Sequence, residues 1–213
     1  MINSEKISKK INKKIKMWLK DHSKLVIAID GYAGSGKTTI ANFIGKHNSN
    51  TLIVHLDDFI KHFKVRKRMI SNAKDKSKVF ESQWYHYDSL EKLIKEFKTG
   101  KQRSIKLKVY NFDKNNFLGK KSFDLSKKIL VINGIFLFYP KNKISKLFDK
   151  KIYIKTDFNK ADRRRILRER KKWGKAYLPE THTDNWTKYF KKAYRNYIKK
   201  YKPQNKADIL FRV

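Results

Sequence analysis

The sequence predicts an α/β fold in which a central parallel sheet lies between layers of helices. Three observations support this prediction: five short apolar segments recur along the chain, most of them are rich in β-branched residues, and segments with helical spacing or loops separate them. Near-continuous apolar strands of this kind are typical of a sheet that is buried on both faces. The predicted strands cover residues 24–30, 51–56, 128–132, 150–155 and 207–213.

Length and composition are those of a single globular domain over residues 1–213. The chain has 213 residues, of which 39% are hydrophobic, and this is too short for two well-buried cores. It contains no cysteine, which excludes disulfides, thiolate metal sites and iron–sulfur clusters. No apolar run approaches the roughly 20 residues of a transmembrane helix. The basic N-terminus lacks the apolar core of a secretory signal, so we expect a cytoplasmic protein.

The formal net charge of +35 raises the question of a nucleic-acid partner. The basic residues are 44 lysines and 10 arginines, and the lysines are spread evenly along the chain. A groove for nucleic acid should cluster its cations and favour arginine, whose planar fork matches phosphate oxygens. We therefore interpret the excess of lysine as compositional bias, and we keep nucleic-acid binding as the less favoured alternative. Six of the ten arginines, however, fall between residues 163 and 195.

The predicted elements follow one another in a simple order. Residues 1–22 hold an amphipathic helix, because Ile7, Ile11, Ile15 and Leu19 recur at four-residue spacing. A helix docked on the domain is the favoured interpretation, and a helix on a membrane surface is the alternative. A second helix follows the first strand over residues 38–46. Residues 60–125 contain a helix near 88–98 and alternating stretches near 105–110 and 116–123, and we interpret them as an inserted flap.

A phosphate-binding motif lies between the first strand and the second helix. Residues 31–38 read GYAGSGKT, which fits G-x-x-x-x-G-K-[ST] in the strand–loop–helix context that the motif requires. Backbone N–H groups of such a loop surround phosphate oxygens, Lys37 neutralises the β- and γ-phosphates, and the Thr38 hydroxyl can bind Mg²⁺. The predicted nucleotide-binding residues are Gly31, Ala33, Gly34, Ser35, Gly36, Lys37, Thr38 and Thr39.

Two further sets of charged residues are candidates for the chemistry. Asp57 directly follows the second strand, beside the phosphate loop, where a carboxylate can accept a hydroxyl proton or hold Mg²⁺. The alternative is that Asp57 or Asp58 caps a helix. Arg164, Arg165 and Arg168 lie on a predicted helix after the fourth strand, where guanidinium groups can stabilise a transferring phosphoryl group. The alternative is a solvated basic helix.

These pieces together resemble the uridine kinase and phosphoribulokinase-type family of P-loop kinases. The resemblance rests on VIAIDGYAGSGKTT at 26–39, HLDDF at 55–59, NGIFLF at 133–138, TDFNKADRRRILRE at 156–169 and KADILF at 206–211. It implies the three-layer sandwich of P-loop NTPases, a mobile arginine-containing lid over residues 159–182 and an acceptor-side insertion over 60–125. It also implies ATP or GTP as phosphoryl donor, Mg²⁺ as cofactor, Asp57 as base and Arg164, Arg165 and Arg168 as lid arginines.

The resemblance further implies a small-molecule acceptor with a hydroxyl group. Uridine or cytidine is the leading acceptor, and nicotinamide riboside, pantothenate or a sugar is the alternative; an RNA 5′-hydroxyl kinase and a non-catalytic relative are further alternatives. Thr38, Asp57 and Asn133 are the candidate metal-binding residues, although Asn133 stands where the family usually has an acidic residue. Many relatives are homo-oligomers, so an oligomer is also possible. The candidate substrate-binding residues are Asp58, Phe80, Glu81, Tyr85, Asp88 and Tyr110, although the aromatic ones are equally expected in the core of the flap.

Overall fold

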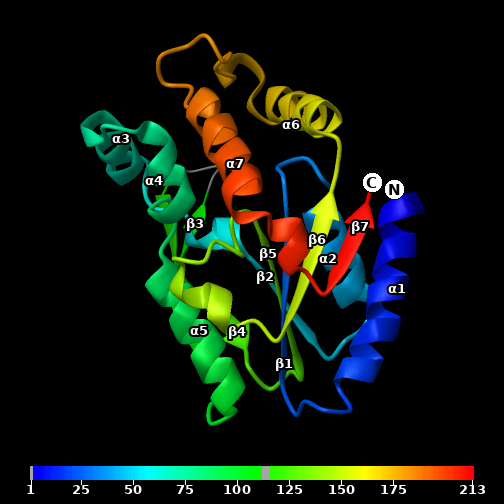
Figure 1. Ribbon diagram of the computed structural model, residues 1–213. Helices are drawn as coiled ribbons and strands as arrows, with labels where there is room; N and C mark the ends of the chain where they lie inside the picture. Colours follow the sequence, from blue (N-terminus) through cyan, green and yellow to red (C-terminus); the bar gives the residue numbers. More distant parts are fainter. Residues whose placement is uncertain (1, 112–115) are drawn as a thin grey trace.

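The computed structural model describes residues 2–111 and 116–213 and has a central sheet between two layers of helices (Figure 1). The strands are β1 (Leu25–Gly31), β2 (Thr51–His55), β3 (Ser104–Asn111), β4 (Asn116–Asp124), β5 (Ile129–Gly134), β6 (Lys150–Lys155) and β7 (Ile209–Arg212). The helices are α1 (Ile2–Trp18), α2 (Lys37–His47), α3 (Phe63–Asn72), α4 (Lys76–Ser82), α5 (Tyr87–Thr99), α6 (Phe158–Trp173) and α7 (Thr187–Tyr201). Short 3-10 helices are η1 (Leu56–Phe59), η2 (Lys143–Lys146), η3 (Gly174–Ala176) and η4 (Pro203–Lys206).

The sheet joins five parallel strands in the order β2-β5-β1-β6-β7. These are the five strands that the sequence predicts, with ends shifted by at most two residues. Every residue of β1 is buried, as the continuous apolar run predicts for the middle of a sheet covered on both faces. Because all five strands are parallel, their carboxyl ends lie along one edge of the sheet, where ligands bind in open α/β folds.

One face of the sheet is covered by α1 and α2. The predicted amphipathic stripe of α1 is buried here, since Ile7, Ile11 and Ile15 are at most 4% exposed. They pack with Ile40 and Ile44 of α2 against the odd-numbered residues of β1. The apolar side of α1 is therefore used in the domain, as the favoured interpretation of this helix predicts.

The other face is covered by α5 and α7. Leu90, Leu93, Ile94 and Phe97 of α5 are fully buried in the same cluster as Tyr197 of α7. The prediction placed α5 inside an inserted flap, whereas the structure makes it a helix of the sandwich itself. The physical reason is its period, because these four apolar residues line one face of the helix and find their partners on the sheet.

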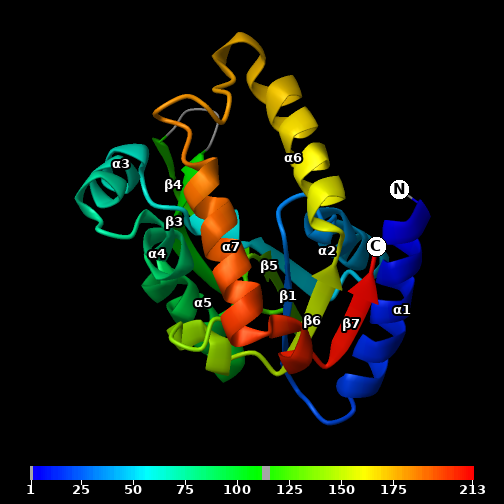
Figure 2. The ribbon, with the colours of Figure 1, turned by 45° about the horizontal axis from the view of Figure 1, so that its top comes forward.

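The remaining parts extend toward the carboxyl ends of the strands, although the hairpin β3–β4 has its base near the start of β1, where Lys24 bonds to the backbone oxygen of Leu125. On one side lie α3, α4 and the antiparallel hairpin β3–β4, and on the other lies α6 with the segment that leads to α7 (Figure 2). In both views α6 reaches beyond the edge of the sheet. No helix within residues 2–111 and 116–213 is long and apolar enough to cross a membrane.

Candidate active site at the carboxyl edge of the sheet

The phosphate-binding loop connects the end of β1 to the start of α2. Gly34 and Gly36 have φ values of 83° and 89°, a left-handed conformation that glycine adopts at little cost. Gly34 also passes so close to α6 that a Cβ atom there would lie 2.1 Å from the backbone oxygen of Ala161. Glycine is thus required at position 34 both by the turn and by the contact with α6.

Lys37 is held inside this loop in the structure. Its Nζ donates a hydrogen bond to the backbone oxygen of Tyr32 at 2.9 Å. Loss of solvent lowers the pKa of Lys37 to about 8, against the opposing influence of the carboxylates of Asp30 and Asp57. Lys37 therefore remains mostly protonated at pH 7, and both aspartates are close enough to stabilise its charge.

Asp30, which the sequence analysis did not single out, lies fully buried beneath the loop. Its Oδ1 accepts the Gly31 N–H at 2.5 Å, and its Oδ2 accepts the Tyr197 hydroxyl at 2.7 Å and the Phe138 N–H at 3.2 Å. Burial raises its pKa to about 6, while these hydrogen bonds and Lys37 act in the opposite direction. Asp30 thus ties the phosphate-binding loop to α7 and to the segment after β5.

The lowered pKa of Lys37 predicts proton uptake when ATP binds above pH 8. In the free protein the ammonium loses its proton as pH rises through about 8, and phosphate oxygens beside it favour the charged form again. Uptake should be small at pH 7 and approach one proton per site near about pH 9. The number of protons taken up is measured by calorimetry of ATP binding in two buffers of different ionisation enthalpy. A Lys37→Arg variant, which stays charged, should show no uptake; equal heats in both buffers for the wild type at pH 9 would contradict the prediction.

Asp57 lies in η1, directly after β2, with an exposed side chain. Its Oδ1 accepts a hydrogen bond from the Tyr85 hydroxyl at 3.3 Å, and its charge acts on Lys37 across the site. Neither aspartate is the N-cap of this short helix, because that position is taken by His55. The neighbouring Asp58 is bound by Lys121 of β4 at 2.8 Å. Of the two aspartates, Asp57 is the one whose charge acts on Lys37 of the phosphate-binding loop.

The candidate Mg²⁺ donors differ in how available their oxygens are. The Thr38 side chain is exposed in the first turn of α2, and Asp57 is exposed as well. Asn133 at the end of β5 is only 4% exposed, and its Oδ1 accepts from His55 Nδ1 at 3.0 Å. That oxygen keeps a second lone pair, so the prediction that Asn133 helps to hold the metal stays a prediction. Thr38 and Asp57 are the more accessible of the three residues, and their oxygens are of the hard kind that Mg²⁺ prefers.

The predicted acceptor-binding residues fall into two groups. Tyr85 and Tyr110 are buried close to Asp57, in the part of the structure between η1 and the hairpin. Phe80 stacks on Trp84, and Glu81 is hydrogen-bonded to Asn196 of α7. Phe80 also packs against Phe190 of α7, with ring centres 5.9 Å apart, so both side chains make contacts between α4 and α7; their role in substrate binding stays a prediction.

Asp88 also lies outside this cluster. Its side chain is 88% exposed and pairs with Lys143 at 3.1 Å. It lies in the first turn of α5, where a negative charge favours the helix N-terminus. The structure thus gives Asp88 a surface position rather than one beside Asp57.

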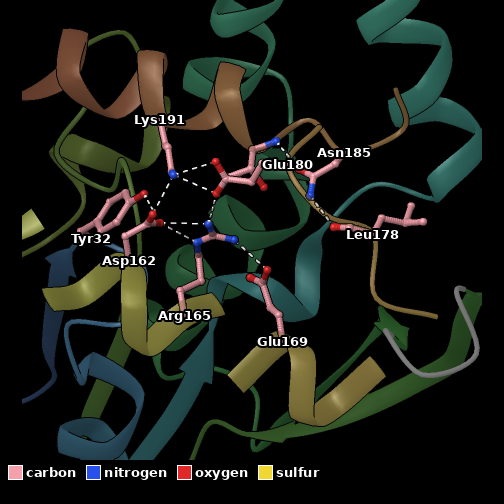
Figure 3. A network of polar contacts seen from close by, with 9 residues as sticks. Tyr32, Asp162, Arg165, Glu169, Leu178, Glu180, Asn185 and Lys191 are labelled. Atoms are coloured by element: carbon pink, nitrogen blue, oxygen red, sulfur yellow. Dashed lines mark hydrogen bonds and ion pairs between the residues drawn. The ribbon is translucent and has the colours of Figure 1, made fainter. Parts of the chain in front are cut away.

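The three predicted lid arginines have different surroundings. Arg165 is 4% exposed and binds the carboxylates of Asp162, Glu169 and Glu180 at 2.7–2.9 Å. Figure 3 shows this network converging from α6, the segment before α7, and α7 itself, where Lys191 binds Asp162 and Glu180. In this structure the guanidinium of Arg165 is occupied by carboxylates, which favours a pairing role over the predicted contact with phosphate.

Arg164 and Arg168 are exposed on α6, and Arg168 lies close enough to Lys37 to lower its pKa. Tyr32 of the phosphate-binding loop adds a hydrogen bond to Asp162 at 3.2 Å. The loop, α6 and α7 are therefore joined through one polar network, with Arg168 beside the loop lysine. In the sequence, Asp162 precedes Arg165 by three positions and Glu169 follows it by four. On a helix both carboxylates can reach the arginine, and this spacing indicates a pairing role for Arg165.

We predict opposite consequences for two arginines on α6. Arg165→Gln should lower the free energy of unfolding by about 3 kcal/mol, because it leaves three partly buried carboxylates with one remaining cation. Arg168→Gln should leave the melting temperature unchanged and lower kcat by about tenfold or more, since it removes a positive charge near Lys37 of the phosphate-binding loop. Thermal melts and steady-state kinetics of both variants make the comparison. A stable Arg165→Gln protein with lowered kcat would reverse the two assignments.

Comparison with known proteins agrees with this arrangement. The model of the phosphoribulokinase / uridine kinase family matches residues 26–213. This chain belongs to that family. Members of the phosphoribulokinase / uridine kinase family include a Ureaplasma parvum uridine kinase, 25% identical over 196 residues that make up 89% of each chain. A Schizosaccharomyces pombe uridine kinase is 27% identical over 182 residues, which are 82% of this chain and 37% of that protein.

Solved structures show the same family fold. A possible uridine kinase from Bacillus stearothermophilus has a TM-score of 0.70 at 21% identity, with 96% of each chain covered. The phosphoribulokinase from Rhodobacter spheroides has a TM-score of 0.61 at 16% identity, covering 89% of this chain and 70% of that chain. The α/β fold predicted from the sequence, a P-loop kinase sandwich around a parallel sheet, is thereby confirmed.

Proposed function

We propose that this protein is an ATP-dependent kinase that transfers the γ-phosphoryl group to a hydroxyl group of a small molecule, with a pyrimidine nucleoside such as uridine or cytidine as the leading acceptor. The observation that carries the proposal is the convergence of Lys37, Asp57 and Arg168 at the carboxyl edge of the sheet, where the charges of Asp57 and Arg168 both act on Lys37. The uridine kinases among the relatives support a nucleoside acceptor.

The phosphate-binding loop and the start of α2 bind the nucleotide in this proposal. Backbone N–H groups at the N-terminus of α2 and the ammonium of Lys37 bind the phosphate oxygens of ATP, or of GTP as the alternative donor. Thr38 and Asp57 are the residues that would hold Mg²⁺, which supplies neutralisation of the β- and γ-phosphates. Arg168 adds a further positive charge from α6, near enough to Lys37 to act on its pKa.

Asp57 orients the acceptor hydroxyl and takes its proton. The acceptor oxygen forms a bond to the γ-phosphorus, the bond from that phosphorus to the bridging oxygen breaks, and its electron pair leaves with ADP. The carboxylate must stay ionised and aimed for this role, and the Tyr85 hydroxyl fixes one of its oxygens. Lys37 and Arg168 stabilise the charge on the phosphoryl oxygens as it moves.

An ADP-release assay tests the proposal directly. The protein is incubated with Mg²⁺ and ATP, or GTP, and with pools of acceptors: uridine and cytidine, nicotinamide riboside, pantothenate, and sugars. Acceptor-dependent ADP release identifies the pool, which is then divided to find the substrate. ATP binding without release in any pool would count against a kinase for these acceptors.

Nucleic-acid binding is the second candidate, and the net charge of +35 is the observation that favours it. It predicts that RNA affinity falls steeply as salt rises, because each neutralised phosphate releases a counterion. RNA affinity that does not change with salt would reject it. An RNA 5′-hydroxyl would appear in the ADP-release assay as an acceptor.

A further inference from the structure

Arg66 of α3 is a buried arginine that the family motifs do not include. The residue is 8% exposed, and its guanidinium carbon lies 5.0–5.7 Å from the ring centres of Phe63, Trp84 and Tyr110. Arginine is an exception in this chain, in which lysine outnumbers it by 44 to 10. Aromatic rings around a guanidinium stabilise its charge and hold its plane in one orientation.

The guanidinium is only partly used by the protein. Its Nε donates to the backbone oxygen of Lys61 at 2.8 Å, and its Nη2 donates to the Tyr110 hydroxyl at 3.2 Å. A guanidinium carries five N–H donors, so three are left over. Within the part of the chain that the structure describes, Arg66 forms no ion pair with a carboxylate, whereas the buried Arg165 forms three. Arg66 therefore has donors that a bound ligand can use.

Arg66 lies on the acceptor side of Asp57. The hydroxyl of Tyr85 donates to Asp57, and the charge of Arg66 lowers the pKa of Tyr85. Burial lowers the pKa of Arg66, and the charge of Asp57 acts in the opposite direction. The guanidinium and the carboxylate are therefore close enough for one small molecule to contact both. Arg68, two residues further along α3, is exposed and has no part in this cluster.

We propose that the free N–H groups of Arg66 bind an oxygen of the phosphoryl acceptor at a point remote from the reacting hydroxyl, so that Arg66 determines which acceptors are taken. The shared chemistry is a hydrogen-bond-accepting oxygen: a base carbonyl in a pyrimidine nucleoside, or a carboxylate or phosphate oxygen in an acidic acceptor. The proposal rests on the kinase function proposed above and names the group that its acceptor must carry.

Kinetics of Arg66→Met and Arg66→Lys test the assignment, with Arg68→Met as the matched control. Loss of a hydrogen bond to a charged group should raise KM for the acceptor by about 10- to 100-fold in Arg66→Met, with a much smaller effect on kcat and on KM for ATP. Arg66→Lys should recover part of the affinity for an anionic acceptor and little for a carbonyl, since it keeps the charge without the fork. Arg68→Met should match the wild type. An unchanged acceptor KM in Arg66→Met would overturn the proposal.

Acceptor analogues provide a test that does not depend on the stability of a variant. For a nucleoside acceptor, the ribosides of pyrimidin-2-one and pyrimidin-4-one each lack one base oxygen of uridine. For an acidic acceptor, the corresponding amide replaces the carboxylate. At least one analogue should bind the wild type about tenfold or more weaker, and the same analogue should show no further loss in Arg66→Met. Full additivity of the two changes would reject the contact. Absence of turnover with every acceptor in the wild type would instead reject the kinase function itself.

Discussion

Asp57→Asn is expected to lower kcat by roughly 10²- to 10⁴-fold while ATP still binds. The amide has nearly the same shape as the carboxylate but cannot take the proton of the acceptor hydroxyl. It also removes the negative charge beside Lys37 that stabilises the ammonium. Acceptor-dependent ADP release measures kcat, and calorimetry measures ATP binding in the same preparation.

Asp58→Asn is the matched control for this experiment. Asp58 is adjacent in sequence and has the same chemistry, but its carboxylate is bound to Lys121 of the hairpin at 2.8 Å. We expect it to keep kcat within a few-fold of the wild type, because a partly exposed ion pair contributes little. Equal losses in the two variants would contradict the assignment of Asp57 as the base.

Gly34→Ala is expected to abolish detectable ATP binding and to destabilise the protein. An alanine at this position would have to keep a φ of 83°. Its Cβ would lie 2.1 Å from the backbone oxygen of Ala161. Left-handed strain and forced displacement of α6 together cost roughly 2–4 kcal/mol. Because the loop must shift, its N–H groups no longer converge on one phosphate. Calorimetry with ATP and thermal melting measure the two effects.

Gly119→Ala separates backbone strain from the steric clash. Gly119 in β4 has a φ of 88°, close to that of Gly34, but no atom lies within 4 Å of the position of its Cβ. In this variant only the left-handed conformation should lower the free energy of unfolding, by about 1 kcal/mol. The corresponding fall in Tm is about 2–4 °C. Its ATP binding should be unchanged. Similar behaviour of the two variants would show that the contact between Gly34 and α6 has no effect.

The buried network around Arg165 gives α6 and the segment before α7 a defined position relative to the phosphate-binding loop. Tyr32 belongs to that loop and bonds to Asp162 of α6, while Lys191 brings α7 to the same carboxylate. Asp30 makes a second link, from beneath the loop to Tyr197 of α7. The loop is therefore supported from two sides by α7, a helix that carries none of the motifs recognised in the sequence.

The sequence by itself was sufficient to predict the phosphate-binding loop, the five strands and the position of Asp57 after β2. Each is a local pattern: a run of apolar residues defines a buried strand, and the spacing of glycines with Lys37 and Thr38 defines the loop. Asp57 follows because parallel strands bring the residues after β1 and β2 to the same edge of the sheet. These features depend on neighbours in the chain and on one general property of α/β sheets.

Only the tertiary structure decided which similar residues have which role. Arg165 and Arg168 are three positions apart on one helix, yet one faces Asp162 and Glu180 and the other lies beside Lys37. The oxygen of Asn133 is used by His55, a residue 78 positions earlier in the chain. Arg66 meets Tyr110 across 44 positions. Such contacts depend on how distant elements pack together, and no local period in the sequence encodes them.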